Sequence, residues 1–92
     1  MKKIIVIEEH ALLRLQHRAE RFGLFHEEAK ERAILAAEFG RQTKRKHLSE
    51  NHETYQLYFQ DNLTFYVICK EKVFEDYLLS VIKTVIIEKG RT

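Results

Sequence analysis

Residues 54–70 read TYQLYFQDNLTFYVICK, and this stretch decides the fold that we predict for the chain. Apolar residues alternate with other residues on both sides of Asp61-Asn62, which is the period of a β-strand with one buried face. Asp61 and Asn62 tolerate positive φ, so we expect a two-residue turn that joins two antiparallel strands. The side chains that share the expected buried face are Tyr55, Leu57, Phe59, Leu63, Phe65, Val67 and Cys69.

The chain upstream of this hairpin predicts one strand and two helices. The continuous apolar run in residues 3–7 is typical of a short buried strand. Glu8 and Glu9 then suit the positive end of a helix, which we expect from about Glu9 to Phe22, with Gly23 as a left-handed cap. A second helix runs from about Glu27 to Phe39, and the short connection indicates an antiparallel helical hairpin. We expect the helices to pack on the sheet through Leu12, Leu15, Ala19, Ala33, Ala36 and Ala37.

The remaining segments predict further strands. Residues 44–48 fit a basic strand. Residues 74–88 carry a helical apolar stripe, but residues 81–87 are β-branched at six of seven positions, which favours a strand. The expected fold is therefore a single α+β domain over residues 1–92. It has an N-terminal strand, a helical hairpin and an antiparallel three- to four-stranded sheet (β-α-α-β-β-β-β).

Composition limits the classes of protein to consider. The chain is 45% hydrophobic and 33% charged, as in a globular domain. Its apolar runs are too short to span a bilayer, and the run after Met-Lys-Lys is too short for a signal peptide, so we expect no membrane association. Cys69 is the only cysteine, which excludes an internal disulfide and fits a cytoplasmic location. The net charge is +2, yet residues 1–48 hold 11 Lys and Arg against 7 acids.

A cationic stripe lies on the first predicted helix. On a helical wheel its five members share an arc of about 100° with no acid on the same face. They are His10, Arg14, His17, Arg18 and Arg21. Two interpretations remain open: a solvated face whose charges pair with local glutamates, or a surface that contacts phosphate.

A second basic cluster follows the second helix and precedes the aromatic strands. It consists of Arg41, Lys44, Arg45, Lys46 and His47. Cations next to exposed rings are typical of proteins that bind single-stranded nucleic acid. We expect Tyr58 and Tyr66 to be exposed, because they lie on the opposite strand faces from Phe59 and Phe65, and we expect Tyr55 to be half-buried.

Other chemistries have little support. The sequence contains no glycine-rich phosphate loop and no paired-carboxylate or Ser-His-Asp pattern. His10 and His17 lack further metal ligands at a companion spacing, and Cys69 fits an inert core thiol. An enzyme here would therefore work without metal or cofactor, using His, Arg, Lys and Tyr as acid, base and charge stabiliser.

Several short motifs resemble a toxin-like family. His10-Ala11-x-x-Arg14 after a strand, then Arg18 and Gly23-Leu24 before Glu27-Glu28, is similar to the small His-Ala-x-x-Arg domains grouped with RelE-, ParE- and BrnT-type toxins. Residues 81–86 also resemble the last strand of that family. Residues 21–29 are similar to the helix-turn-helix stretch of BrnT. Here Arg18 stands further from the glycine than is usual, Phe25 replaces a Ser or Thr cap, and the closing arginine motif of BrnT is absent.

The resemblance implies two helices on a curved antiparallel sheet, metal-free RNA cleavage, often on the ribosome, and neutralisation by a small antitoxin protein. By position, only His10, Arg14 and Arg18 carry over from the family. The resemblance and the residue patterns together predict a catalytic set of His10, Arg14, Lys46, His47 and Tyr58. The expected RNA-contacting set is His17, Arg18, Arg21, Arg41, Lys44, Arg45 and Lys83.

An alternative function remains open. In it the protein is a non-enzymatic adaptor or a self-associating small domain, such as a homodimer, that uses an exposed strand edge.

Overall fold

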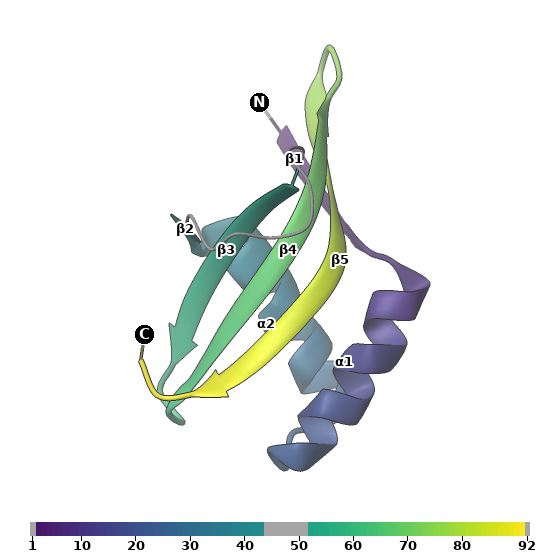
Figure 1. Cartoon of the computed structure of the whole chain (residues 1–92). Coiled ribbons are helices and arrows are strands. Elements are labelled where there is room, and N and C mark those ends of the chain that lie inside the picture. The colour runs from purple at the N-terminus through teal and green to yellow at the C-terminus, as the bar shows by residue number, and fades with distance from the viewer. Residues whose placement is uncertain (1, 44–51, 92) are drawn as a thin grey trace.

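The computed structural model describes residues 2–43 and 52–91, which form two layers, a sheet and a pair of helices (Figure 1). The α+β class and the order of strand, helical hairpin and later strands are as predicted. The elements are β1 (Lys2–Ile7), α1 (Glu9–Arg21), α2 (His26–Phe39), β2 (Arg41–Thr43), β3 (His52–Phe59), β4 (Leu63–Val73) and β5 (Tyr77–Lys89).

The sheet is mixed, with the strand order β1-β5-β4-β3-β2. β2 to β5 pair in antiparallel fashion, whereas β1 runs parallel to β5. The four antiparallel strands agree with the expected three- to four-stranded antiparallel sheet, but β1 joins them as a parallel edge strand, so five strands are described. Parallel neighbours need a long connection, which the helices and the following strands supply here. The basic strand expected at residues 44–48 lies outside the described residues.

The turn between β3 and β4 differs from the predicted two-residue turn. Phe59 pairs with Leu63, so Gln60, Asp61 and Asn62 form a three-residue loop. Asn62 has a φ of 65°, and its amide donates to the Phe59 carbonyl at 3.0 Å. One left-handed residue at the end of such a loop matches the twist of the two strands, so Asp61 needs no positive φ.

The strand predicted for the last segment is confirmed, and it contains a bulge. Cys69 of β4 pairs with Ile82 and Ile68 pairs with Thr84, which leaves Lys83 as the additional residue on β5. A bulge bends its strand and redirects a side chain. Lys83 accordingly forms an ion pair with Glu8, at the point where β1 leads into α1.

The core lies between the helices and one face of the sheet. Small alanines on α2 (Ala29, Ala33, Ala36 and Ala37) and Leu15 and Ala19 on α1 pack against Phe65, Val67, Cys69, Ile82 and Val85. The predicted packing residues are thus confirmed, with Leu12 only partly buried. Gly40 ends α2 where a Cβ atom would lie 2.2 Å from the Ala36 carbonyl oxygen and 2.8 Å from that of Gln56. The backbone of α2 therefore passes directly beside β3.

β4 is the central strand, and both of its faces are buried over residues 63–69. Tyr66 and Ile68, which point away from the helices, are 4% and 1% exposed. The prediction that Tyr66 is exposed was wrong, because alternation assigns a side chain to a face without telling whether that face is covered. Neither of the helices in the described part of the chain is long and apolar enough to cross a membrane.

Candidate nucleic-acid interface

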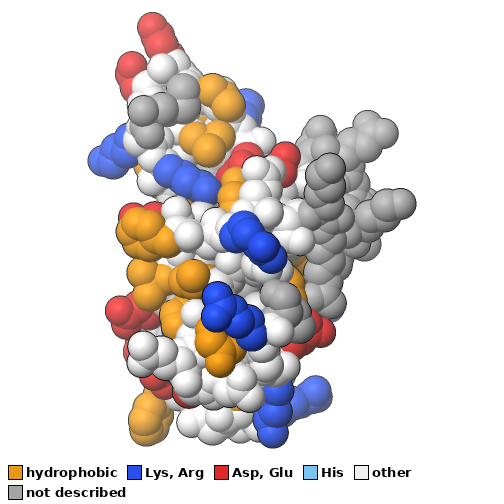
Figure 2. Space-filling model, turned by 90° about the vertical axis from the view of Figure 1, so that its left-hand side faces the viewer, with side chains coloured by type: hydrophobic (Ala, Val, Ile, Leu, Met, Phe, Trp, Pro, Cys, Tyr) orange, Lys and Arg blue, Asp and Glu red, His pale blue; other side chains and the backbone are white. Residues whose placement is uncertain are grey.

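A groove lies at the edge of β3, beside Arg41, where β2 begins. β2 pairs only with Thr54 to Gln56, so the rest of β3 has no strand on that side among the described residues. The groove has a volume of about 540 Å³, within the range of small-ligand sites. Its lining residues are Phe39, Arg41, Gln56, Leu57, Tyr58, Thr64 and Arg91. Figure 2 views the molecule from the side of β2 and β3, where Lys and Arg side chains lie among hydrophobic ones.

Backbone and side-chain bonds bring Arg91 to Tyr58. The Gly90 amide donates to the Asn62 carbonyl at 2.8 Å, and the Thr64 hydroxyl donates to the Gly90 carbonyl. The Tyr58 hydroxyl donates to the Asn62 side chain at 3.1 Å. The Arg91 guanidinium carbon then lies 5.3 Å from the centre of the Tyr58 ring, within cation–π range. The turn between β3 and β4 therefore positions both groups.

Two cations in the groove are available to a ligand. Arg41 and Arg91 are exposed, and within the described part of the chain neither forms an ion pair with a carboxylate. Sequence reasoning singled out Arg41 and Tyr58 but missed Arg91. Arg91 is a single cation after Gly90, and no local pattern links it to a tyrosine so distant in sequence.

The stripe on α1 is shorter than predicted. His10, Arg14, His17 and Arg21 are exposed, as a ligand-binding face requires. Arg18 is partly buried instead, and its guanidinium donates to the Val85 carbonyl. β1 pairs with β5 only as far as Ile82, so the later carbonyls on that edge of β5 lie beside α1. Arg18 therefore binds one of them and serves the packing of α1.

The expected catalytic residues do not form one site among the described residues. His10 and Arg14 lie on α1, which packs against β5, whereas Tyr58 lies on β3, with β4 between these strands. Arg41 is the only other expected site residue beside Tyr58 in the described part of the chain. Lys83 is engaged with Glu8. The expected residues Lys44, Arg45, Lys46 and His47 lie outside the described residues.

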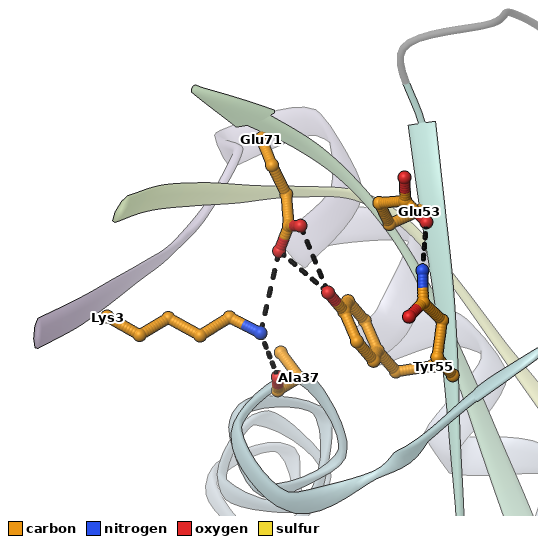
Figure 3. Close-up of polar contacts among 6 residues, drawn as sticks. Lys3, Ala37, Glu53, Tyr55 and Glu71 are labelled. Carbon is orange, nitrogen blue, oxygen red and sulfur yellow. Dashed lines mark hydrogen bonds and ion pairs between the residues drawn. The ribbon is translucent and has the colours of Figure 1, made fainter. Parts of the chain in front are cut away.

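A polar network closes one end of the core on the helix side (Figure 3). The Tyr55 hydroxyl lies 3.0 Å from both carboxylate oxygens of Glu71, and the Lys3 ammonium lies 3.5 Å from the same carboxylate. Lys3 also donates to the Ala37 carbonyl at 2.8 Å and lies 4.1 Å from the centre of the Tyr55 ring. The network therefore links β1, β3 and β4 to the end of α2.

Burial sets the ionisation of the groups around this network. Burial, followed by the hydrogen bond to Glu71, raises the pKa of Tyr55 well above its usual range. Burial likewise raises the pKa of the Cys69 thiol to about 11, so at neutral pH it is a protonated core group. As predicted, Tyr55 is half-buried and Cys69 is a core thiol. In residues 2–43 and 52–91, no three His, Cys, Asp or Glu side chains are placed to hold a metal ion.

No family model, no curated protein and no solved structure matches this chain.

Proposed function

We propose that this protein is an RNA-directed module that binds single-stranded RNA in the groove formed by β2, β3 and Arg91. The observation that supports this proposal is the convergence of Arg41, Arg91 and the Tyr58 ring in one groove. An arginine fork donates two parallel hydrogen bonds to phosphate oxygens, and a tyrosine ring accepts a stacked base. Together they supply the two kinds of contact that single-stranded nucleic acid offers.

The exposed part of the α1 stripe is a second contact surface in this proposal. His10, Arg14, His17 and Arg21 lie near the β5 side of the sheet, away from the groove. A long RNA, or RNA within a ribosome, can reach both surfaces.

The resemblance to toxin-like domains extends the proposal to metal-independent RNA cleavage in the cytoplasm, with a small antitoxin as partner. Tyr58 is the only described residue of the groove, apart from its arginines, that suits such chemistry, because phenol can transfer a proton and arginine can stabilise a phosphorane charge. Incubating the protein with RNA and a chelator tests this part. Cleavage that persists with the chelator and disappears in Tyr58→Phe is the expected result.

Fluorescence anisotropy with a labelled single-stranded RNA, measured over a range of salt concentrations, tests the binding proposal. Each lost phosphate contact lowers the slope of log K against log salt by roughly 0.7. Arg41→Gln/Arg91→Gln should therefore lower the slope by about 1.4 and weaken binding. The matched control is Lys70→Gln/Lys72→Gln, which removes two exposed cations near the opposite end of β4. Equal binding by wild type and the Arg41/Arg91 variant would refute the groove as an RNA site.

A further inference from the structure

The outer edge of β1 has no strand beside it among the described residues. β1 comes first in the strand order and pairs on one side only, with β5. Its six residues read KKIIVI, and the side chains of Ile4 and Val6 are 36% and 46% exposed. A strand edge presents N–H and C=O groups that water or another strand must satisfy. An apolar edge of this kind is a surface that another strand can join.

The hydrogen bond from the Glu8 amide to the Ile82 carbonyl identifies the backbone groups that point outward. Along a strand, the N–H and C=O groups of successive residues point to opposite sides. Val6 and Ile4, which precede Glu8 by two and four residues, therefore point these groups toward β5. Lys3, Ile5 and Ile7 consequently direct their N–H and C=O groups away from the sheet. These three residues form the hydrogen-bonding edge that a partner strand would meet.

The opposite edge of the sheet is different. β2 has only three residues, Arg41, Gln42 and Thr43, and its side chains are polar. Short polar edges are a common protection against unwanted strand pairing. On β1 the inward-pointing Lys3 does not give that protection, because its charge is already paired with Glu71. The sheet therefore has one protected edge and one edge that remains competent to pair.

We propose that two copies of this chain associate by antiparallel pairing of their β1 strands, so that one sheet continues across both copies. The partner follows from the charge pattern of residues 2–9, which read KKIIVIEE. When this segment pairs with itself in antiparallel orientation, Lys2 of one copy meets Glu8 of the other. Lys3 is already paired with Glu71 and Glu9 begins α1, so Lys2 and Glu8 are the charges that face each other, and Glu8 also pairs with Lys83 within its own copy. The apolar centres meet each other at the same time. The segment is therefore complementary to itself, and a second copy is the occupant that it fits.

One register satisfies the edge best. With the twofold axis at Ile5, Ile5 opposes Ile5 of the second copy, Lys3 opposes Ile7, Ile4 opposes Val6, and Lys2 opposes Glu8. In this register Lys3, Ile5 and Ile7 each oppose a residue whose N–H and C=O groups also point toward the partner strand. Each of these pairs can therefore form two hydrogen bonds. A twofold axis at Ile4 would instead place Lys2 against Val6 and lose the charge pairing. The exposed Ile4 and Val6 side chains become neighbours across the interface on the open face of the sheet.

Sedimentation velocity over a range of protein concentrations tests the association and its register. Wild type should form a dimer as concentration rises. Ile4→Lys alone and Val6→Glu alone should each raise the dimer dissociation constant about tenfold or more, because each puts a charge against an apolar side chain. An equimolar mixture of the two variants should regain dimer, because the new lysine and glutamate oppose each other. Leu13→Lys and Leu13→Glu are matched controls, since Leu13 is 53% exposed on α1, and neither should change the dimer.

A cross-linking experiment tests the same register independently. Opposing strand residues lie within disulfide reach, so a mixture of Ile4→Cys and Val6→Cys should form a heterodimer on mild oxidation. Each variant alone should cross-link far less, because its introduced thiols lie two positions apart along the strands. The proposal is overturned if wild type remains a monomer at its highest soluble concentration, or if both charge variants remain dimeric. It is also overturned if the mixture of charge variants does not regain the dimer and the mixture of cysteine variants does not cross-link.

Discussion

One guanidinium nitrogen of Arg32 lies 2.7 and 2.9 Å from the two carboxylate oxygens of Asp61. Arg32 belongs to α2 and Asp61 to the turn between β3 and β4, so this contact holds the helix layer to one end of the sheet. The same guanidinium lies 4.7 Å from the centre of the Phe59 ring and 3.2 Å from Glu28. Because the turn also binds Tyr58 and Gly90 through Asn62, Arg32 supports the geometry of the groove.

Arg32→Ala should lower the free energy of unfolding by about 1–2 kcal/mol, since a charge-assisted contact and ring packing are lost from a mostly buried side chain. Urea denaturation followed by circular dichroism measures the change. Arg14→Ala, on the exposed face of α1, is the control and should stay within about 0.5 kcal/mol of wild type. If both variants unfolded at the same urea concentration, Arg32 would have no role in stability.

Arg18→Gln and Arg14→Gln should separate structure from binding on one helix. Arg18 donates to the Val85 carbonyl, so its replacement should cost about 1 kcal/mol of unfolding free energy. Arg14 is exposed, and its replacement should leave stability unchanged while weakening RNA binding. Thermal unfolding and RNA anisotropy of the two variants measure these effects. Equal stability of the two would contradict the structural role of Arg18.

Tyr55 and Glu71 should be energetically coupled. Tyr55→Phe removes the donor, and Glu71→Leu removes the acceptor and leaves the Lys3 ammonium without its carboxylate. In a double-mutant cycle the coupling free energy should be about 1 kcal/mol, because each single change already breaks the shared contact. The four proteins of the cycle are compared by urea denaturation. Additive losses would mean that the contact contributes nothing beyond the packing of the two side chains.

Cys69 should make stability fall at alkaline pH. The folded-state pKa is raised from 9.0 to about 11, so the stabilising contribution is fully present below about pH 9 and is lost as pH rises toward 11. Tyr55, whose folded pKa is also raised, adds a loss that starts above about pH 10. Urea denaturation at several pH values should show a smaller decline between pH 9 and 11 in Cys69→Ala than in wild type. An identical decline in both proteins would contradict this linkage.

A thiol reagent gives a second test of the same group. Cys69 is fully buried on β4, so it should react at neutral pH only as fast as the protein unfolds. Adding urea should accelerate labelling in proportion to the unfolded fraction. Rapid labelling of the folded protein would show that the thiol is reached without unfolding.

The sequence by itself determined the elements whose signals are local. Period-two alternation around residues 54–70 predicted β3 and β4, and β-branched content predicted β5, because pleated strands accept such side chains on a buried face. The apolar stripe and terminal Gly23 predicted the first helix, and Gly23 has the positive φ expected of its cap. Each of these features depends on residues a few positions apart.

The tertiary structure alone decided how those elements meet. The parallel pairing of β1 with β5, the bulge at Lys83 and the burial of Tyr66 depend on which strands lie side by side and which faces are covered. The contact of Arg91 with Tyr58 and that of Arg18 with Val85 likewise join residues that are distant in sequence. Side-chain periodicity shows which residues share a face, but it does not show what covers that face. The packing of the whole chain decides which neighbouring element covers a face and which distant residue a charged side chain contacts.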